Sequence, residues 1–361
     1  MTTKNYPCKS CGAKLEYAPG QHALQCPYCG AKNDIPEDQK ATIAAVEELD
    51  YQAYLANQAG NEPTIASQNV KCTGCGAESQ LAANLVSDRC PFCAVPLIAT
   101  NAYAARQIRP KAIAPFDIKE SEARGKFADW VKGLWFAPNA LKQAYRAERG
   151  LKGIYTPYWT YDADSYTTYQ GQRGVDYTVT ETYTENGETK TRQVTRTNWY
   201  PAAGAVQVAF DDVLVIGSKT LPTSYAENLA PWKLEKLQGY RDDYVSGFTV
   251  EAYQVGLEPG FVDAQGKMES VIRDAICRDI GGDHQRISAM QPRYSNISFK
   301  HILLPIWLSS YKYSDKVYRF LVNGQTGEVQ GERPYSAWKI AGAILLGLIV
   351  VGVVIMLGQK Q

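Results

Sequence analysis

The chain has 361 residues, with 38 Lys and Arg against 37 Asp and Glu, and a formal net charge of +1. This balance excludes a chain that is basic throughout, such as a histone-like protein or a polyanion coat. Apolar residues make up 45% of the sequence and charged residues 21%, so the chain can bury a hydrophobic core and is not disordered as a whole. The length allows two or three domains. The opening residues, MTTKNYPCKSCG, contain no apolar stretch, and we expect no signal peptide.

Eight of the nine cysteines form four Cys-x-x-Cys pairs, and the second set of four repeats the spacing C-x2-C-x14-C-x2-C of the first. A repeated spacing of this kind indicates a duplicated module. Two such pairs place four soft thiolates around one divalent ion. We therefore predict two rubredoxin-knuckle zinc ribbons, at residues 1–35 and 70–100, each holding one Zn²⁺. The predicted ligands are Cys8, Cys11, Cys26 and Cys29 in the first ribbon, and Cys72, Cys75, Cys90 and Cys93 in the second.

Two other uses of these cysteines stay open as alternatives. A rubredoxin-like iron site has a similar sequence pattern. Thioredoxin-type redox pairs fit less well, because four pairs in one repeated register make poor sense as independent dithiols. Nucleic-acid binding by the ribbons is disfavoured by charge, because residues 1–100 carry seven Lys and Arg against ten Asp and Glu, whereas phosphate binding needs clustered cations.

The segment between the ribbons, residues 36–69, opens with Pro36-Glu37-Asp38 and continues with apolar residues at helical spacing, which predicts a helical spacer. Residues 108–335 then read as one mixed α+β cytosolic domain that is rich in tyrosine. An amphipathic helix is predicted from Lys119 to Phe136, and a short second helix from Asn139 to Arg149.

The middle of the chain alternates Thr, Tyr and Val, which is typical of β-strands. The alternation reverses at Asn186-Gly187, a strong signal for a hairpin turn. A helix is predicted from Glu258 to Ile280, because apolar residues recur at helical spacing and Gly281-Gly282 follows them. Further strands are predicted at Phe210–Ile216, Ile297–Leu308 and Tyr311–Val322.

The C-terminal run from Ile340 to Leu357 contains no charged residue. At 1.5 Å per residue it is about 27 Å long, close to the thickness of a bilayer core, so we predict a transmembrane helix at 338–358. Basic residues that precede this run, and thiols that need a reducing compartment, place the N-terminal bulk in the cytosol. The sequence thus predicts a single-pass protein of the cytoplasmic (inner) membrane, with the lipid bilayer among its partners.

Signatures of enzymes are absent from the sequence. The segment GFVDAQGK, from Gly260 to Lys267, has one residue too many between its glycines for a phosphate-binding loop. The three histidines belong to no HExxH motif, and no GxSxG occurs. Asp162-Ala163-Asp164 begins like a calcium loop but lacks the later ligands. We therefore predict no enzyme and no catalytic residue, with an unrecognised enzyme in the central domain as an open alternative.

Several motifs spread over nearly all the chain resemble a family of bacterial YdjG-like zinc-ribbon, single-span membrane proteins, which are often labelled primosomal protein N′ or replication-restart helicase-like. The matching motifs are YPCxSCGA, CPYCGA, VKCxGCGA, CPFC, LWFAPN, YTPYWTYDA, FDDVLV and VNGQTGEVQGERPYS. The second ribbon departs from the pattern at Ala94, where the first ribbon has a glycine.

The resemblance implies a membrane-tethered adaptor or scaffold that recruits protein partners of the SPFH/flotillin-like or phage-shock type during envelope stress, and an oligomer is compatible with it. The alternative is a nucleic-acid-binding protein of DNA replication or repair without ATPase activity of its own. The sequence departs from a helicase because both nucleotide-binding motifs are missing. The predicted fold class is therefore multidomain α+β, with two tandem zinc ribbons, a Tyr-rich α+β domain and a C-terminal transmembrane helix.

Overall fold

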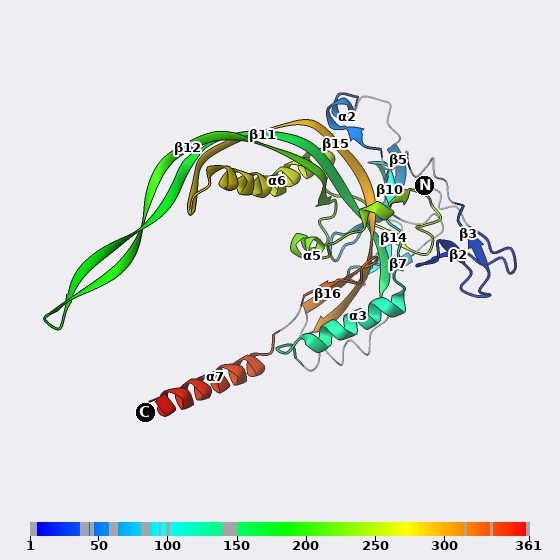
Figure 1. Ribbon diagram of the computed structural model, residues 1–361. Coiled ribbons are helices and arrows are strands. Elements are labelled where there is room, and N and C mark those ends of the chain that lie inside the picture. The colour runs from blue at the N-terminus through cyan, green and yellow to red at the C-terminus, as the bar shows by residue number, and fades with distance from the viewer. Residues whose placement is uncertain are drawn as a thin grey trace.

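Three long curved strands form the centre of the molecule (Figure 1): β11 (Lys152–Glu185), β12 (Glu188–Ile216) and β15 (His284–Tyr313). The computed structural model describes residues 6–36, 43, 47–57, 64–80, 87–93, 95–98, 102–138, 150–313, 316–332 and 335–358. β11 pairs antiparallel with β12 on one side and with β15 on the other. All other described elements of the body are arranged around this three-stranded arch.

The predicted hairpin at Asn186-Gly187 is confirmed. Both residues have positive φ angles, 56° and 83°, and Glu185 pairs directly with Glu188. A two-residue turn of this type matches the right-handed twist of the strands that it joins. The pairing then continues for the whole length of β12, down to Tyr158 opposite Ile216.

The fold class predicted from the sequence, multidomain α+β, is wrong. The described part of the chain is mostly β-sheet with few helices, because segments expected to be separate short strands join into strands of 34, 29 and 30 residues. β-Bulges beside Asp162, and positive φ angles at Asp212 (52°) and Asn296 (51°), let these strands bend without ending. A bulge bends and twists a strand locally while the ladder on either side continues.

Short strands complete the sheet, in the order β12-β11-β15-β10-β13, with further strands attached to β11, β15 and β16. These strands are β4 (Leu49–Asp50), β10 (Ala112–Ile113), β13 (Gln238–Gly239), β14 (Thr249–Val250), β16 (Lys316–Asn323) and β17 (Val329–Gly331). Three smaller sheets hold the N-terminal strands: β1 (Glu16–Ala18), β2 (Ala23–Gln25) and β3 (Lys32–Asp34); β5 (Thr64–Lys71), β6 (Glu78–Gln80) and β9 (Ala102–Ile108); β7 (Ser87–Arg89) and β8 (Pro96–Ile98).

The longest helix of the body, α6 (Leu257–Ile280), lies under the arch of the three long strands (Figure 1). Its predicted position is confirmed, and Gly281 follows it with a φ of 65°. Gly260 lets the helix approach the sheet closely, because a Cβ there would lie 2.5 Å from the hydroxyl of Tyr161. That hydroxyl donates a hydrogen bond to the carbonyl of Leu257 at 2.7 Å.

The other helices are short or peripheral. α3 (Glu120–Gly133) forms within the predicted range, and its Phe127 stacks on Phe320 with ring centroids 3.5 Å apart. The remaining short elements are α5 (Thr223–Glu227) and the 3₁₀ turn η2 (Leu234–Lys236). The predicted helix from Asn139 to Arg149 lies outside the described residues. So does much of the predicted spacer, of which the structure describes α2 (Tyr51–Asn57).

The C-terminal helix α7 (Ala337–Gly358) forms and leaves apolar side chains such as Leu346 (64% exposed) in solvent. Within the residues that the structure describes, no helix has the length and apolar character needed to span a membrane. The predicted transmembrane helix, the single-pass arrangement and the placement in the cytoplasmic membrane are not supported, and we correct them.

An aromatic cluster fixes the region where α2 and α6 meet the sheet. Phe299 of β15 is fully buried, and Tyr54 and Tyr51 of α2 meet its ring edge-on at 5.1 and 6.4 Å. Trp159 of β11 lies 6.1 Å from the same ring. Phe299 therefore connects two strands of the arch to a segment more than 240 positions away in sequence.

We expect Phe299→Ala to lower the free energy of unfolding by about 3 to 5 kcal/mol, because it removes this ring and leaves a cavity. Denaturant unfolding followed by circular dichroism measures the change. Tyr166→Ala is the matched control, since Tyr166 lies on the same sheet but is 47% exposed. Equal stability losses in the two variants would contradict this account of the core.

Candidate metal centres

Each cysteine pair of the first module sits in a tight knuckle. The N–H of Cys8 donates to the carbonyl of Ala13 at 2.7 Å, and the N–H of Gly12 donates back to the carbonyl of Cys8 at 2.8 Å. Gly12 adopts a φ of 76°, a conformation that side chains with a Cβ rarely take. The pair Cys26 and Cys29 repeats this arrangement with Gly30.

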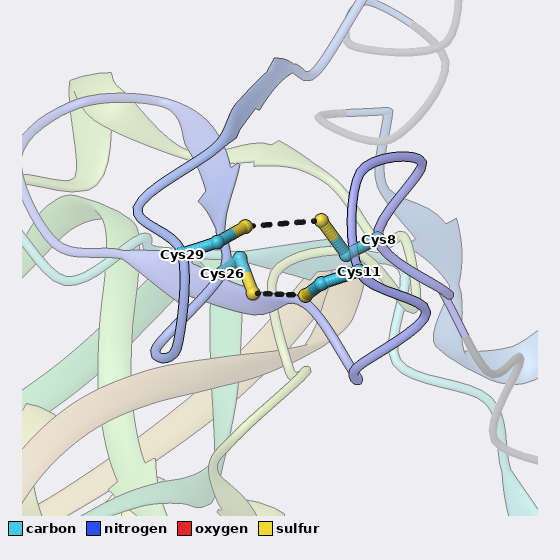
Figure 2. A group of neighbouring side chains, drawn as sticks. All are labelled: Cys8, Cys11, Cys26 and Cys29. Carbon is cyan, nitrogen blue, oxygen red and sulfur yellow. Dashed lines mark hydrogen bonds between the residues drawn. The ribbon is translucent and has the colours of Figure 1, made fainter.

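The eight predicted ligands come together as two separate clusters, one for each module. In Figure 2 the two knuckles of the first module face each other, and their sulfur atoms meet between them. The Sγ atoms of Cys8 and Cys29 are 3.5 Å apart, as are those of Cys11 and Cys26. In the second module, Cys72 and Cys93 are separated by 3.4 Å, and Cys75 and Cys90 by 3.6 Å.

This geometry fits a four-coordinate ion. Zinc–sulfur bonds of about 2.3 Å in a tetrahedron require sulfur–sulfur separations of about 3.8 Å, and the ligand atoms of each cluster all lie within 4.8 Å of one another. All nine cysteines are free thiols, so no disulfide competes for the eight. Each cluster could therefore hold one metal ion.

Local hydrogen bonds lower the pKa of some thiols in each cluster and raise that of their partners. Backbone N–H groups of Ser10 and Cys11 lower the pKa of the Cys8 thiol to about 6. In the second module the hydrogen bond between the thiols of Cys75 and Cys90 lowers the pKa of Cys75 to about 5. Since thiolates rather than thiols bind metals, a lowered pKa favours ligation near neutral pH.

The first module rests on the body through its strands. The N–H of Tyr17 donates to the carbonyl of Ser246 at 2.9 Å, and the Ser246 hydroxyl donates to the carbonyl of Leu15 at 2.7 Å. Leu15 and Tyr17 are buried in a cluster shared with Phe116 of the body. Cys8 and Cys26 are buried in this same cluster, whereas Cys11 and Cys29, at the outer ends of the knuckles, are exposed.

The second module also contacts the body through backbone hydrogen bonds and a buried aromatic ring. Gln254 donates from Nε2 to the carbonyl of Gly76 at 3.1 Å, and the N–H of Ala252 donates to the carbonyl of Glu78 at 3.0 Å. Its knuckle residue Phe92 is fully buried in a hydrophobic cluster that also contains Ile154 of β11. Ala94, the residue that departs from the glycine pattern, lies outside the described residues.

Sequence reasoning missed a charged cluster beside the bulge of β11. Glu48, Asp162, Asp211 and Asp212 have carboxylate oxygens within 4.8 Å of one another. Lys300, which is almost fully buried, lies among them, with Nζ 2.8 Å from Glu48 and 3.0 Å from Asp212. The ammonium group thus offsets part of the negative charge of the four acids, and burial together with Glu48 raises the pKa of Asp162 to about 7. We interpret the cluster as an ion-pair network rather than a calcium loop.

The remaining residues considered in the sequence do not converge on a further site. The segment Gly260–Lys267 is part of helix α6 and forms no phosphate loop. His22 is exposed in the first module, and His284 lies 3.0 Å from Asp176 on the arch. His301 is buried against Trp159, with ring centroids 4.8 Å apart.

The two metal clusters should differ in how fast they release metal. Because Cys11 and Cys29 are exposed whereas Cys75 and Cys93 are half-buried, we expect a chromogenic chelator to remove metal in a fast and a slow phase. The double variant Cys11→Ser/Cys29→Ser should lack the fast phase, and Cys75→Ser/Cys93→Ser should lack the slow one. Identical single-phase release from both variants would contradict this assignment.

His301 should make the fold sensitive to acid. Burial lowers its pKa to about 4, so between pH 6.5 and 4 the unfolded chain binds a proton that the folded chain does not. Stability should therefore fall by up to about 3 kcal/mol as the pH drops through this range. In the wild-type chain the carbonyl of Ile108 lies 2.9 Å from Nδ1 of His301, and the amide of His301→Asn can still donate to it. Because this variant has no imidazole to protonate, it should not show the stability loss that His301 causes when unfolding is measured as a function of pH. A loss of the same size in the variant would refute the assignment.

Comparison with known proteins gives one informative similarity. The chain is similar to a protein of Bacillus subtilis (strain 168) named "Uncharacterized protein YdjG", with 25% identity over 342 residues that cover 93% of this chain and 92% of that protein. No protein-family model matches the chain, and no solved structure matches it at a significant level. The similarity over nearly the whole length, together with the two tetracysteine clusters, supports a relationship to a YdjG-like family.

Proposed function

We propose that this protein is a zinc-stabilised scaffold that binds a partner protein through the exposed knuckle of its first tetracysteine module. One observation carries the proposal. Tyr28 in the knuckle CPYC and Phe92 in the knuckle CPFC occupy equivalent positions of the duplicated module, yet Tyr28 is 84% exposed and Phe92 is fully buried. The same aromatic position packs into the body in one module and faces solvent in the other.

The buried copy suggests what the exposed copy does. Phe92 packs into an apolar cluster formed with the body. A knuckle of this type can therefore bind to a protein surface through its aromatic residue. An exposed aromatic side chain on a rigid support is the kind of residue that dominates protein interfaces. A zinc ion bound by the four thiolates would hold the first knuckle rigid, which reduces the entropy lost when a partner binds.

Charge supports a protein partner over a nucleic acid. The first hundred residues carry more acidic than basic side chains, and each tetrathiolate zinc centre would add about two negative charges. The first module itself has four Lys against one Glu and one Asp, so with its zinc centre it would be close to neutral and would lack the clustered cations that phosphate binding needs. We therefore expect no salt-sensitive binding of DNA. The partner classes implied by the family resemblance, flotillin-like and phage-shock-type scaffold proteins, are the first to test.

We expect Tyr28→Asp to abolish partner binding and Tyr28→Phe to preserve it, because the contact is made by the ring. Tyr200→Asp is the matched control, since Tyr200 is 53% exposed but lies on β12, away from the metal centres. Cross-linking and affinity capture with the zinc-loaded full chain, followed by binding measurements on the purified partner, check this. Metal content confirms that Tyr28→Asp still holds both ions. Equal affinity of the partner for Tyr28→Asp and the unchanged protein would refute the proposal.

A further inference from the structure

The outer part of the long hairpin has an open sheet edge. β15 begins at His284 opposite Gly174, whereas β11 continues to Glu185. From residue 175 onwards no strand of the described chain pairs with that side of β11. Figure 1 shows this part of β11 and β12 projecting as a twisted ribbon beyond β15 and α6. Two strands alone give little stability, and a ribbon gains from additional strands.

The backbone groups that face the open edge can be assigned. The N–H of Asp283 donates to the carbonyl of Gly174 at 2.9 Å, and the N–H of Asp176 donates to a carboxylate oxygen of Asp283 at 2.8 Å. Backbone groups alternate in direction along a strand, so the even-numbered residues of β11 point away from β12. The N–H and C=O groups of Thr178, Thr180 and Thr182 therefore face the open edge.

This stretch lacks the prolines and bulges that often protect edges. The neighbouring edges are interrupted by Pro201 in β12 and Pro292 in β15, and proline is a common means of blocking strand addition. Residues 175–185 contain neither proline nor glycine, and their pairing with β12 shows no bulge. Beyond the end of β15, this side of β11 can therefore pair with another strand.

The sequence of the open edge is nearly symmetric about Thr180. It reads Tyr-Thr-Val-Thr-Glu-Thr-Tyr from Tyr177 to Tyr183. If two such strands pair antiparallel about Thr180, each Tyr177 lies opposite the other copy's Tyr183, and each Thr178 lies opposite the other copy's Thr182. Aromatic and threonine pairs of this kind stabilise antiparallel sheets. In this register the outward-facing even-numbered residues meet each other, as hydrogen-bonded pairs require.

Charge selects this edge over the opposite edge of the ribbon. About Thr180, Glu181 faces Val179 and Asp176 faces Thr184, so no two like charges are directly opposed. The outer edge of β12 has a similar symmetry about Gln193, but there Lys190 would oppose Arg196. Like charges directly opposite each other destabilise a strand pair.

We propose that two copies of this chain associate by antiparallel pairing of their β11 edges over residues 177–183, with the two-fold axis at Thr180. The ribbons then form one four-stranded sheet, β12-β11 of one copy followed by β11-β12 of the other, and the two bodies lie at opposite ends. This isologous contact closes on itself and yields a dimer rather than a filament. The pairing adds about six backbone hydrogen bonds.

The test uses Thr180→Pro in the full chain, studied by analytical ultracentrifugation over a range of concentrations, with one mild detergent throughout to shield the exposed helix α7. Proline removes an N–H that faces the open edge and leaves the ladder with β12 intact. Gln193→Pro is the matched control, because Gln193 pairs directly with Thr180 and its N–H faces the other edge. We expect a dimer for the unchanged protein and for Gln193→Pro, and at least about tenfold weaker association for Thr180→Pro.

Hydrogen exchange locates the contact independently. The amides of Thr178, Thr180 and Thr182 should gain protection as the concentration of the unchanged protein rises through the dimer transition. A monomer at every concentration, a dimer unaffected by Thr180→Pro, or weakening of equal size in Gln193→Pro would each overturn the proposal. So would dimerisation without added protection of these three amides.

Discussion

The continuous hydrogen-bond ladder of β11 is the constraint on which the rest of this structure depends. Along its inner part β11 has a partner on both sides, and this pairing keeps three very long strands in register through a pronounced bend. Because a slip of one residue would move every side chain to the other face of the sheet, the ladder determines which residues reach the core. The helix α6, the segment α2 and both metal modules are positioned by contacts with this arch or with the loops beside it.

The bend itself is produced by a small number of residues. Bulges at Asp162, with left-handed backbone at Asp212 and Asn296, concentrate the curvature at one level of the sheet. Carboxylates gather at the same level, and the buried ammonium group of Lys300 forms ion pairs with two of them, Glu48 and Asp212. Burial of these charges is tolerated because they are paired, whereas removal of one partner would leave a charge without compensation.

The duplicated modules show how one sequence pattern serves two structural roles. Each module has too few residues to build a core of its own, and a bound metal ion would supply the missing cohesion. The second module gains further stability from the body, which covers its knuckle at Phe92. The first keeps its knuckle in solvent, and this difference between two related modules supports a recognition role for the first.

The sequence by itself determined the features that depend on residues close together in the chain. The spacing of the cysteines specifies two tetrathiolate clusters, because a Cys-x-x-Cys turn directs both sulfurs to one side. Asn186-Gly187 specifies the hairpin, and the apolar spacing before Gly281 specifies α6. Only the tertiary structure decided the long-range features. The length of the strands, the meeting of Glu48 with Lys300, the burial of Phe92 and the exposure of Tyr28 depend on contacts between segments far apart in the chain. The C-terminal run shows the same limit. Its composition predicted a transmembrane helix, but no helix among the described residues has the length and apolar character to span a membrane.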